Sequence, residues 1–192
     1  LHVIAKYPNI CKHIHLPVQS GSNRILKEMN RLHTREEYMT LIDKIRAIIP
    51  NASISQDMIA GFPTETEQDH QDTMSLMEYV KYNFGYMYSY SERPGTLAGR
   101  KMEDDVEEET KARRLQEIVD LQQKHAWFRS EEFVGQVVEV LVEKVSKKSK
   151  DEFSGRNSQS ITVVFPKENY KIGDFVNVKI TSCTSGTLKG EA

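Results

Sequence analysis

The chain has 192 residues, of which 38% are hydrophobic and 28% charged, and its formal net charge is −2. This composition suffices for one large domain or two smaller ones, and it excludes a globally basic nucleic-acid-binding protein and a membrane span. The two cysteines, Cys11 and Cys183, lie far apart, so we expect reduced thiols in a cytoplasmic protein and no disulfide framework or zinc site.

Residues 1 to about 100 alternate between strand and helix patterns. Strands are expected at about 13–18, 53–60 and 84–90, where apolar or aromatic residues recur in short runs. The alternation predicts a parallel sheet with right-handed crossovers. Three strands make a thin sheet, and the chain begins with Leu1, so we expect it to be the C-terminal part of a longer protein.

Helix signals follow the first two strands. A helix is expected at about 22–30, and a second begins at the capping box of Thr34 and stops before Pro50. Another capping box, from Thr64 to Glu67, predicts the start of a third helix.

Small polar residues stand where the first strand gives way to a helix. Gln19 and Ser20 offer an amide and a hydroxyl, which suit a polyhydroxylated group such as a ribose, and Gly21 permits close backbone approach. The alternative for Ser20 or Ser22 is a helix N-cap. The ends of parallel strands are where such sheets place ligands.

The second strand ends in a similar arrangement. The backbone around Gly61 could bond the edge of a flat base with Phe62 alongside, and Asp57 is either a binding residue or half of a structural salt bridge. Arg31 and Arg93 could hold a carboxylate or phosphate, or form surface ion pairs.

Two further patterns concern side-chain chemistry. The tyrosines of the third strand, at 86, 88 and 90, are interpreted as core rather than as a base-stacking surface.

No Ser–His–Asp arrangement, metal-ligand spacing or catalytic acid–base pair is recognisable, so we predict no catalytic residue and no metal site within this chain.

A second domain follows a long helix. Residues 103–109 are acid-rich and suit the start of a helix of about 107–131. From about 133 the period changes to two, with roughly five short β patterns, which predicts a small OB-like barrel. We place the domains at 1–128 and 129–192.

The first hairpin of the barrel concentrates positive charge. A set of six residues in and after it is predicted to bind RNA: Lys144, Lys147, Lys148, Lys150, Arg156 and Asn157. The alternative for this hairpin is an exposed solubilising turn.

Five motifs occur together in order: HLPVQSGS at 15–22, MNR at 29–31, DMIAGFPTET at 57–66, YSERPGT at 90–96 and SGRN at 154–157. The set resembles the methylthiotransferases, a family of radical S-adenosylmethionine (SAM) enzymes that carry a TRAM domain. The resemblance implies an α/β fold, the C-terminal half of a partial (βα) barrel, followed by an all-β TRAM barrel. The chain has GFPTET where the family commonly has GFPGET, so Thr64 replaces a glycine. The added side chain puts in question whether a ligand can approach the backbone closely at this position.

The resemblance also implies a cofactor. Seven residues would bind SAM: Gln19, Ser20, Arg31, Asp57, Gly61, Phe62 and Arg93. The family holds two 4Fe–4S clusters through six cysteines that precede this stretch, and Cys11 and Cys183 match neither set. We therefore expect the clusters to be ligated outside this chain and the chain alone to be inactive.

The motifs look most like the members that add a methylthio group to the 2-position of N6-isopentenyladenosine next to the tRNA anticodon. The implied partner is the tRNA anticodon stem-loop, in the cytoplasm, with the protein expected as a monomer. Two alternatives stay open: a methylthiotransferase acting on an aspartate of a ribosomal protein, and a non-catalytic RNA-binding module.

Overall fold

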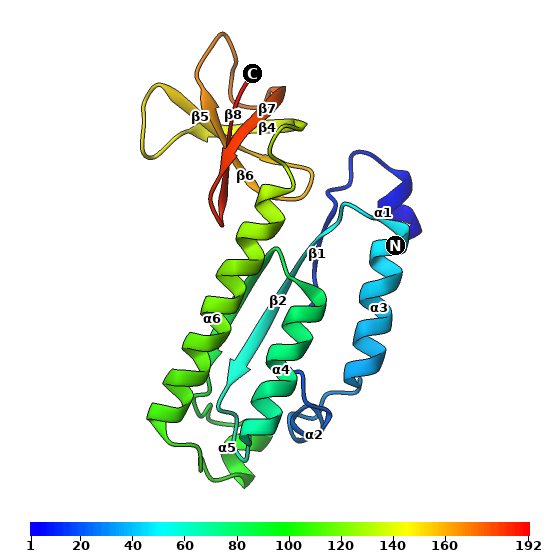
Figure 1. Ribbon diagram of the computed structural model, residues 1–192, viewed down its shortest axis with the longest axis vertical. Helices are drawn as coiled ribbons and strands as arrows, with labels where there is room; N and C mark the ends of the chain where they lie inside the picture. The colour runs from blue at the N-terminus through cyan, green and yellow to red at the C-terminus, as the bar shows by residue number, and fades with distance from the viewer.

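The computed structural model describes residues 1–192 and shows two units joined by one long helix (Figure 1). The first unit contains a three-stranded parallel sheet in the order β1-β2-β3, with strands His13–His15, Ser53–Ala60 and Phe84–Ser89. Its helices are α1 (His2–Lys6), α2 (Asn23–Glu28), α3 (Arg35–Ile48), α4 (Glu67–Val80), α5 (Leu97–Lys101) and α6 (Glu108–Glu131). The predicted parallel α/β arrangement is confirmed.

The first strand is shorter than the predicted 13–18. Regular pairing stops at His15, and Pro17 lacks the N–H that a ladder would need. Pairing resumes at Gln19, whose N–H donates to the Asp57 carbonyl at 2.9 Å and whose carbonyl accepts from Ile59 at 3.0 Å. Beyond Pro17, the polar loop of residues 19–22 therefore pairs with β2 only at Gln19.

One predicted capping box is confirmed and the other is wrong. Thr34 caps α3 together with Glu37. The α4 box is formed by Thr66 with Asp69, not by Thr64 with Glu67. Thr64 has a φ of 68°, a left-handed conformation that does not match the extended backbone of an N-cap residue.

The helices cover only one face of the sheet. Fourteen buried residues form the core, with contributions from β2 (Ile54, Met58) and from α3, α4 and α6. In Figure 1, α4 lies beside β2 with α3 to its right, and α6 packs against α4, β2 and β3. The other face is open: Tyr86 and Tyr88 are 48% and 51% exposed, so the core interpretation is wrong for these two tyrosines, whereas Tyr90 is half-buried against Phe62.

The second unit is a closed barrel with strand order β4-β5-β6-β8-β7. Its strands are β4 (Val137–Val145), β5 (Glu152–Asn157), β6 (Thr162–Pro166), β7 (Phe175–Cys183) and β8 (Thr187–Glu191). A separate core of nine residues fills it, among them Val140, Phe153 and Phe165. The predicted small barrel is therefore confirmed, and the expected domain boundary at 128/129 falls in the last turn of α6. None of the helices combines the length and apolar character that a membrane crossing requires.

Candidate functional site

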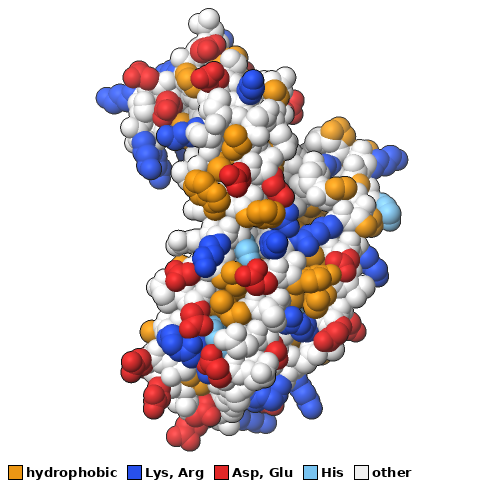
Figure 2. Space-filling model, viewed as in Figure 1, with side chains coloured by type: hydrophobic (Ala, Val, Ile, Leu, Met, Phe, Trp, Pro, Cys, Tyr) orange, Lys and Arg blue, Asp and Glu red, His pale blue; other side chains and the backbone are white.

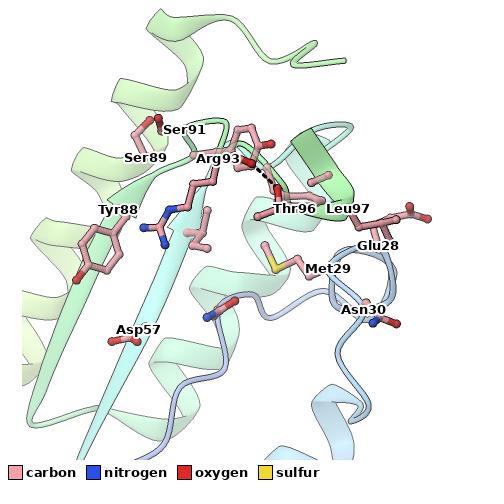
Figure 3. A pocket seen from close by; sticks show the side chains of 15 residues that line it. Glu28, Met29, Asn30, Asp57, Tyr88, Ser89, Ser91, Arg93, Thr96 and Leu97 are labelled. Atoms are coloured by element: carbon pink, nitrogen blue, oxygen red, sulfur yellow. Dashed lines mark hydrogen bonds between the residues drawn. The ribbon is translucent and has the colours of Figure 1, made fainter. Parts of the chain in front are cut away.

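A cavity of about 640 Å³ opens at the carboxyl ends of the three strands (Figure 3). Its walls come from the loop after β1, the end of α2, the ends of β2 and β3, and the loop leading into α5. Four of the seven residues predicted to bind SAM line it: Gln19, Asp57, Phe62 and Arg93. We call this cavity the strand-end pocket.

Gln19 enters the pocket from a constrained backbone. Its φ is 72°, a region that costs a residue with a side chain roughly 1–2 kcal/mol. The two hydrogen bonds to β2 hold it there. Such a constraint fixes the direction of the side-chain amide, which is what a binding residue requires.

Asp57 also has a structural partner. Its side chain is 27% exposed and lies 3.5 Å from Nε2 of His15, whose Nδ1 in turn lies 2.8 Å from Oγ of Ser55. The structure thus contains a Ser–His–Asp arrangement that sequence spacing did not reveal, created by the parallel pairing of β1 with β2. Ser55 is 1% exposed, so no substrate reaches its hydroxyl, and the trio orders Asp57 rather than forming a nucleophile.

Phe62 and Arg93 form the aromatic and cationic parts of the pocket. Phe62 packs edge-on against Tyr90 at 5.2 Å between ring centroids. Arg93 is exposed and takes part in none of the ion pairs of the chain, which excludes the surface ion-pair alternative. In Figure 3 its guanidinium extends toward Tyr88 and the strand that carries Asp57, so a free cation faces the cavity.

The other three predicted residues lie outside the lining. Ser20 is fully buried, and its hydroxyl accepts from the Ser22 N–H at 3.2 Å, which is a loop-forming role. Gly61 is covered by Lys111, since a Cβ there would lie 2.2 Å from the Lys111 Cγ. Arg31 is partly buried beyond α2 and away from the cavity. Direct contact of these three with a pocket ligand does not fit this arrangement.

Several lining residues were not predicted. The end of α2 and the loop before α5 supply Met29, Asn30, Ser91 and Thr96, and Tyr88 comes from the open face of β3. Tyr88 was signalled by the aromatic alternation, although its direction depends on which sheet face the helices cover. The other four lie within the MNR and YSERPGT motifs, which assigned no role to them.

Asp69 connects the loop before α2 to the loop before α4, beside the pocket. It accepts hydrogen bonds from Ser22 Oγ at 2.6 Å, from the Thr66 N–H at 2.8 Å and from the guanidinium of Arg24. Burial alone would raise the pKa of this carboxyl, but these donors outweigh it and hold the pKa well below its usual range. Ser22 also caps α2, as its helix-cap alternative predicted.

A His–carboxylate group lies between α4 and α6. His70, Glu67 and Glu117 place their ligand atoms within 4.8 Å of one another. Arg113 already pairs with both glutamates at 2.6 Å, and Arg114 lies 3.3 Å from Glu67. These guanidiniums neutralise the carboxylates, so we assign the group to the packing of α4 against α6.

The cysteines of this chain do not fit an iron–sulfur cluster. Such clusters are held by several cysteine thiolates on one side. Cys11 is exposed in the loop before β1, whereas Cys183 belongs to β7 of the barrel. No reaction step is therefore assigned to a cluster on these residues.

Basic side chains flank the β4–β5 hairpin of the barrel (Figure 2). The four predicted lysines at 144, 147, 148 and 150 are all exposed, and none forms an ion pair. Arg156 is 57% exposed but faces the sheet unit. Asn157 is 4% exposed, and its side-chain oxygen accepts from two backbone N–H groups of the next turn, so it shapes the turn instead of offering itself to RNA.

Comparisons with known proteins agree with this architecture. Residues 1–77 match the family model of the radical SAM superfamily, and residues 131–192 match that of the TRAM domain. Coproporphyrinogen III oxidase from Escherichia coli, a radical SAM enzyme of solved structure, aligns with a TM-score of 0.52 at 15% identity, over 77% of this chain and 41% of that chain. That likeness supports the fold.

The sequence relatives are much closer. The chain is 96% identical over 192 residues to the tRNA-2-methylthio-N(6)-dimethylallyladenosine synthase of Flavobacterium johnsoniae, and 90% identical to that of Flavobacterium psychrophilum. The synthase of Christiangramia forsetii is 68% identical over 191 residues. Each comparison covers all of this chain, which spans 40% of the length of these curated relatives. The chain is therefore similar over its whole length to proteins named as this synthase, and it combines a radical SAM segment with a TRAM domain.

Proposed function

We propose that this chain is the SAM- and RNA-binding part of an enzyme that attaches a methylthio group to the 2-position of N6-isopentenyladenosine beside the tRNA anticodon. The observation that carries the proposal is the 96% identity, over the whole chain, to a protein named as such a synthase. A pocket at the strand ends and a barrel with a basic hairpin support the proposal, because the reaction requires one site for SAM and one for RNA.

The strand-end pocket fits SAM in its donor set. Asp57 supplies a carboxylate and Gln19 an amide, both suited to ribose hydroxyls, while Phe62 offers an aromatic edge to the adenine. The free guanidinium of Arg93 suits the carboxylate of the methionine part. Bound SAM, with a reduced cluster, would supply the radical that abstraction from an unactivated C–H bond requires.

The residues of this chain would then bind SAM and orient it. The Gln19 backbone is fixed by β2, and His15 orders Asp57, so both polar groups are positioned before a ligand arrives. Preorganised groups lower the entropy lost on binding. No acid–base step is assigned to them.

The barrel is proposed to hold the tRNA anticodon stem-loop. Four exposed lysines without ion pairs on one hairpin support this proposal, because each cation that meets a phosphate releases a condensed counterion. We further propose that the enzyme acts in the cytoplasm, where tRNA is found, and as a monomer.

The proposal is tested in cells. The full-length protein would be expressed in a bacterium whose own synthase gene is deleted, and tRNA nucleosides analysed by mass spectrometry. Appearance of 2-methylthio-N6-isopentenyladenosine is the expected result. Persistence of unmodified N6-isopentenyladenosine would refute the tRNA activity, and a methylthio mass on a ribosomal-protein aspartate would identify the alternative substrate.

A further inference from the structure

A second cleft, of about 420 Å³, lies where the barrel meets the amino ends of the strands. We call it the junction cleft, and the residues used below are His13, Phe84, Tyr86, Arg129, Arg156 and Ser160. Figure 1 shows the β5–β6 turn of the barrel on the side that faces the sheet. The cleft is separate from both the strand-end pocket and the tip of the lysine hairpin.

The two walls of the junction cleft are held together by hydrogen bonds. The Lys12 N–H donates to the Ser158 carbonyl at 2.6 Å, and the Ser53 hydroxyl donates to the Gln159 carbonyl at 2.9 Å. Ser53 also lies 2.6 Å from Nδ1 of His13. The cleft therefore has a defined shape rather than being a gap between independent domains.

Charge in the junction cleft is one-sided. The chain has 28 acidic residues, yet none of them lines this cleft, whereas Arg129 and Arg156 do. Arg129 is held in place, since its Nε donates to the Lys81 carbonyl at 2.8 Å and its Nη1 pairs with Glu132 at 3.3 Å. Arg156 is 57% exposed and has only a long contact, 3.6 Å, with Glu143. One anchored guanidinium on α6 and one exposed guanidinium on β5 suit an anion bound between them.

Aromatic rings complete the cleft. Phe84 and Tyr86 are 47% and 48% exposed on the open face of the sheet, and their rings pack edge to face at 4.8 Å. Both belong to β3, so their positions are rigid. Exposed rings beside guanidiniums are the arrangement by which proteins bind unpaired nucleotides, with the base on a ring and the phosphate on a cation.

We propose that the junction cleft binds one unpaired nucleotide of the RNA substrate, with its phosphate between Arg156 and Arg129 and its base against Phe84 and Tyr86. This inference rests on the proposed function, because it takes RNA as the substrate. It requires single-stranded RNA, since a base within a helix is stacked and cannot reach a protein ring.

The test measures fluorescence anisotropy of a fluorescein-labelled eight-nucleotide single-stranded RNA with this chain at several salt concentrations. Arg156→Gln should weaken binding and lower the salt slope by about 0.7, the value for one phosphate contact on a single strand. Phe84→Ala should weaken binding about 5- to 150-fold, the range of base–aromatic stacking, and leave the salt slope unchanged.

Matched controls carry the same changes elsewhere. Lys44→Gln removes one positive charge from an exposed position of α3, and Phe175→Ala removes a ring that is 68% exposed on the barrel. Both should bind the RNA as the parent does. Circular dichroism melts of all four variants establish that each is folded.

Several outcomes would overturn the inference: no RNA binding by the parent chain, parental binding by Arg156→Gln and Phe84→Ala, equal losses in the controls, or equal affinity for a duplex of the same sequence. Displacement by micromolar AMP would identify a free-nucleotide site instead. The tRNA nucleoside assay is independent of this cleft, so a positive result there with a negative result here refutes only the inference.

Discussion

The hydrogen bonds to Asp69 offer the sharpest test of how the loops before α2 and α4 are held beside the strand-end pocket. The substitution Asp69→Asn keeps the size of the side chain but removes its charge. Each carboxylate oxygen accepts at least two bonds in the parent, Oδ1 from Ser22 and Arg24 and Oδ2 from Thr66 and Arg24. An amide group has one acceptor oxygen, so its NH₂ must face donors on the other side.

The magnitude follows from these bonds. Hydrogen bonds to charged groups contribute about 1.5–3 kcal/mol each, and the Arg24 side chain, at 45% exposed, is partly screened by water. We expect Asp69→Asn to lower the free energy of unfolding by about 2–4 kcal/mol. The exposed control Asp120→Asn should change it by less than about 0.5 kcal/mol.

The pH dependence has a defined sign. Because hydrogen bonding lowers the pKa of folded Asp69 from 3.8, its contribution is fully present above the unfolded pKa and is lost as the pH falls toward the folded pKa. The difference in unfolding free energy between parent and Asp69→Asn should therefore be constant from pH 7 to about pH 5 and decrease by about 1 kcal/mol by pH 3. Urea unfolding at each pH measures it. Parental stability of the variant, or a difference that grows toward pH 3, would refute the reasoning.

Three further predictions concern the pocket and the barrel. Gly61→Ala should lower the urea-unfolding free energy by more than about 1 kcal/mol, because a Cβ at φ 72° is strained and meets Lys111. In the full-length protein, Gln19→Gly should weaken SAM binding by about 1–2 kcal/mol in calorimetry without loss of stability, because glycine relieves the positive φ while the amide contact is lost. Changing Lys147, Lys148 and Lys150 to Ala should flatten the salt slope of stem-loop binding in anisotropy by about two to three units, and an unchanged slope would remove the hairpin from the RNA site.

Local signals in the sequence were sufficient for most of the fold. The β2 bounds were predicted correctly because a short run containing Ile54, Met58 and Ile59 ends at a glycine. The Thr64 box failed because two threonines compete within three positions, and only backbone dihedrals distinguish the extended Thr66 from the left-handed Thr64. Hydrophobic periodicity locates a helix but carries no information about the backbone dihedral angles of the residues at its ends.

The pocket was predicted less well than the fold, for a physical reason. Gln19, Phe62 and Arg93 could be found because each follows a strand, and parallel strands bring these ends together. Asp57 could be found because it is a charged residue within the otherwise strand-like run of β2. The roles of Ser20 and Gly61 depend on contacts with α4 and α6, which begin some 45 to 50 positions later in the chain. Contacts between residues this far apart in the chain cannot be predicted from a local sequence pattern.

The open face of β3 connects the two proposed sites. Tyr86 lines the junction cleft, and Tyr88, two residues along the same strand face, lines the strand-end pocket. Alternate residues of a strand are about 7 Å apart, so a nucleotide on Phe84 and Tyr86 lies within one strand length of the pocket. A single strand of RNA that follows this face would reach both sites, which gives the exposed aromatic ladder a function that burial in a core could not provide. If both proposals hold, the base to be modified would lie at the carboxyl ends of the strands and its unpaired neighbour would lie toward the barrel.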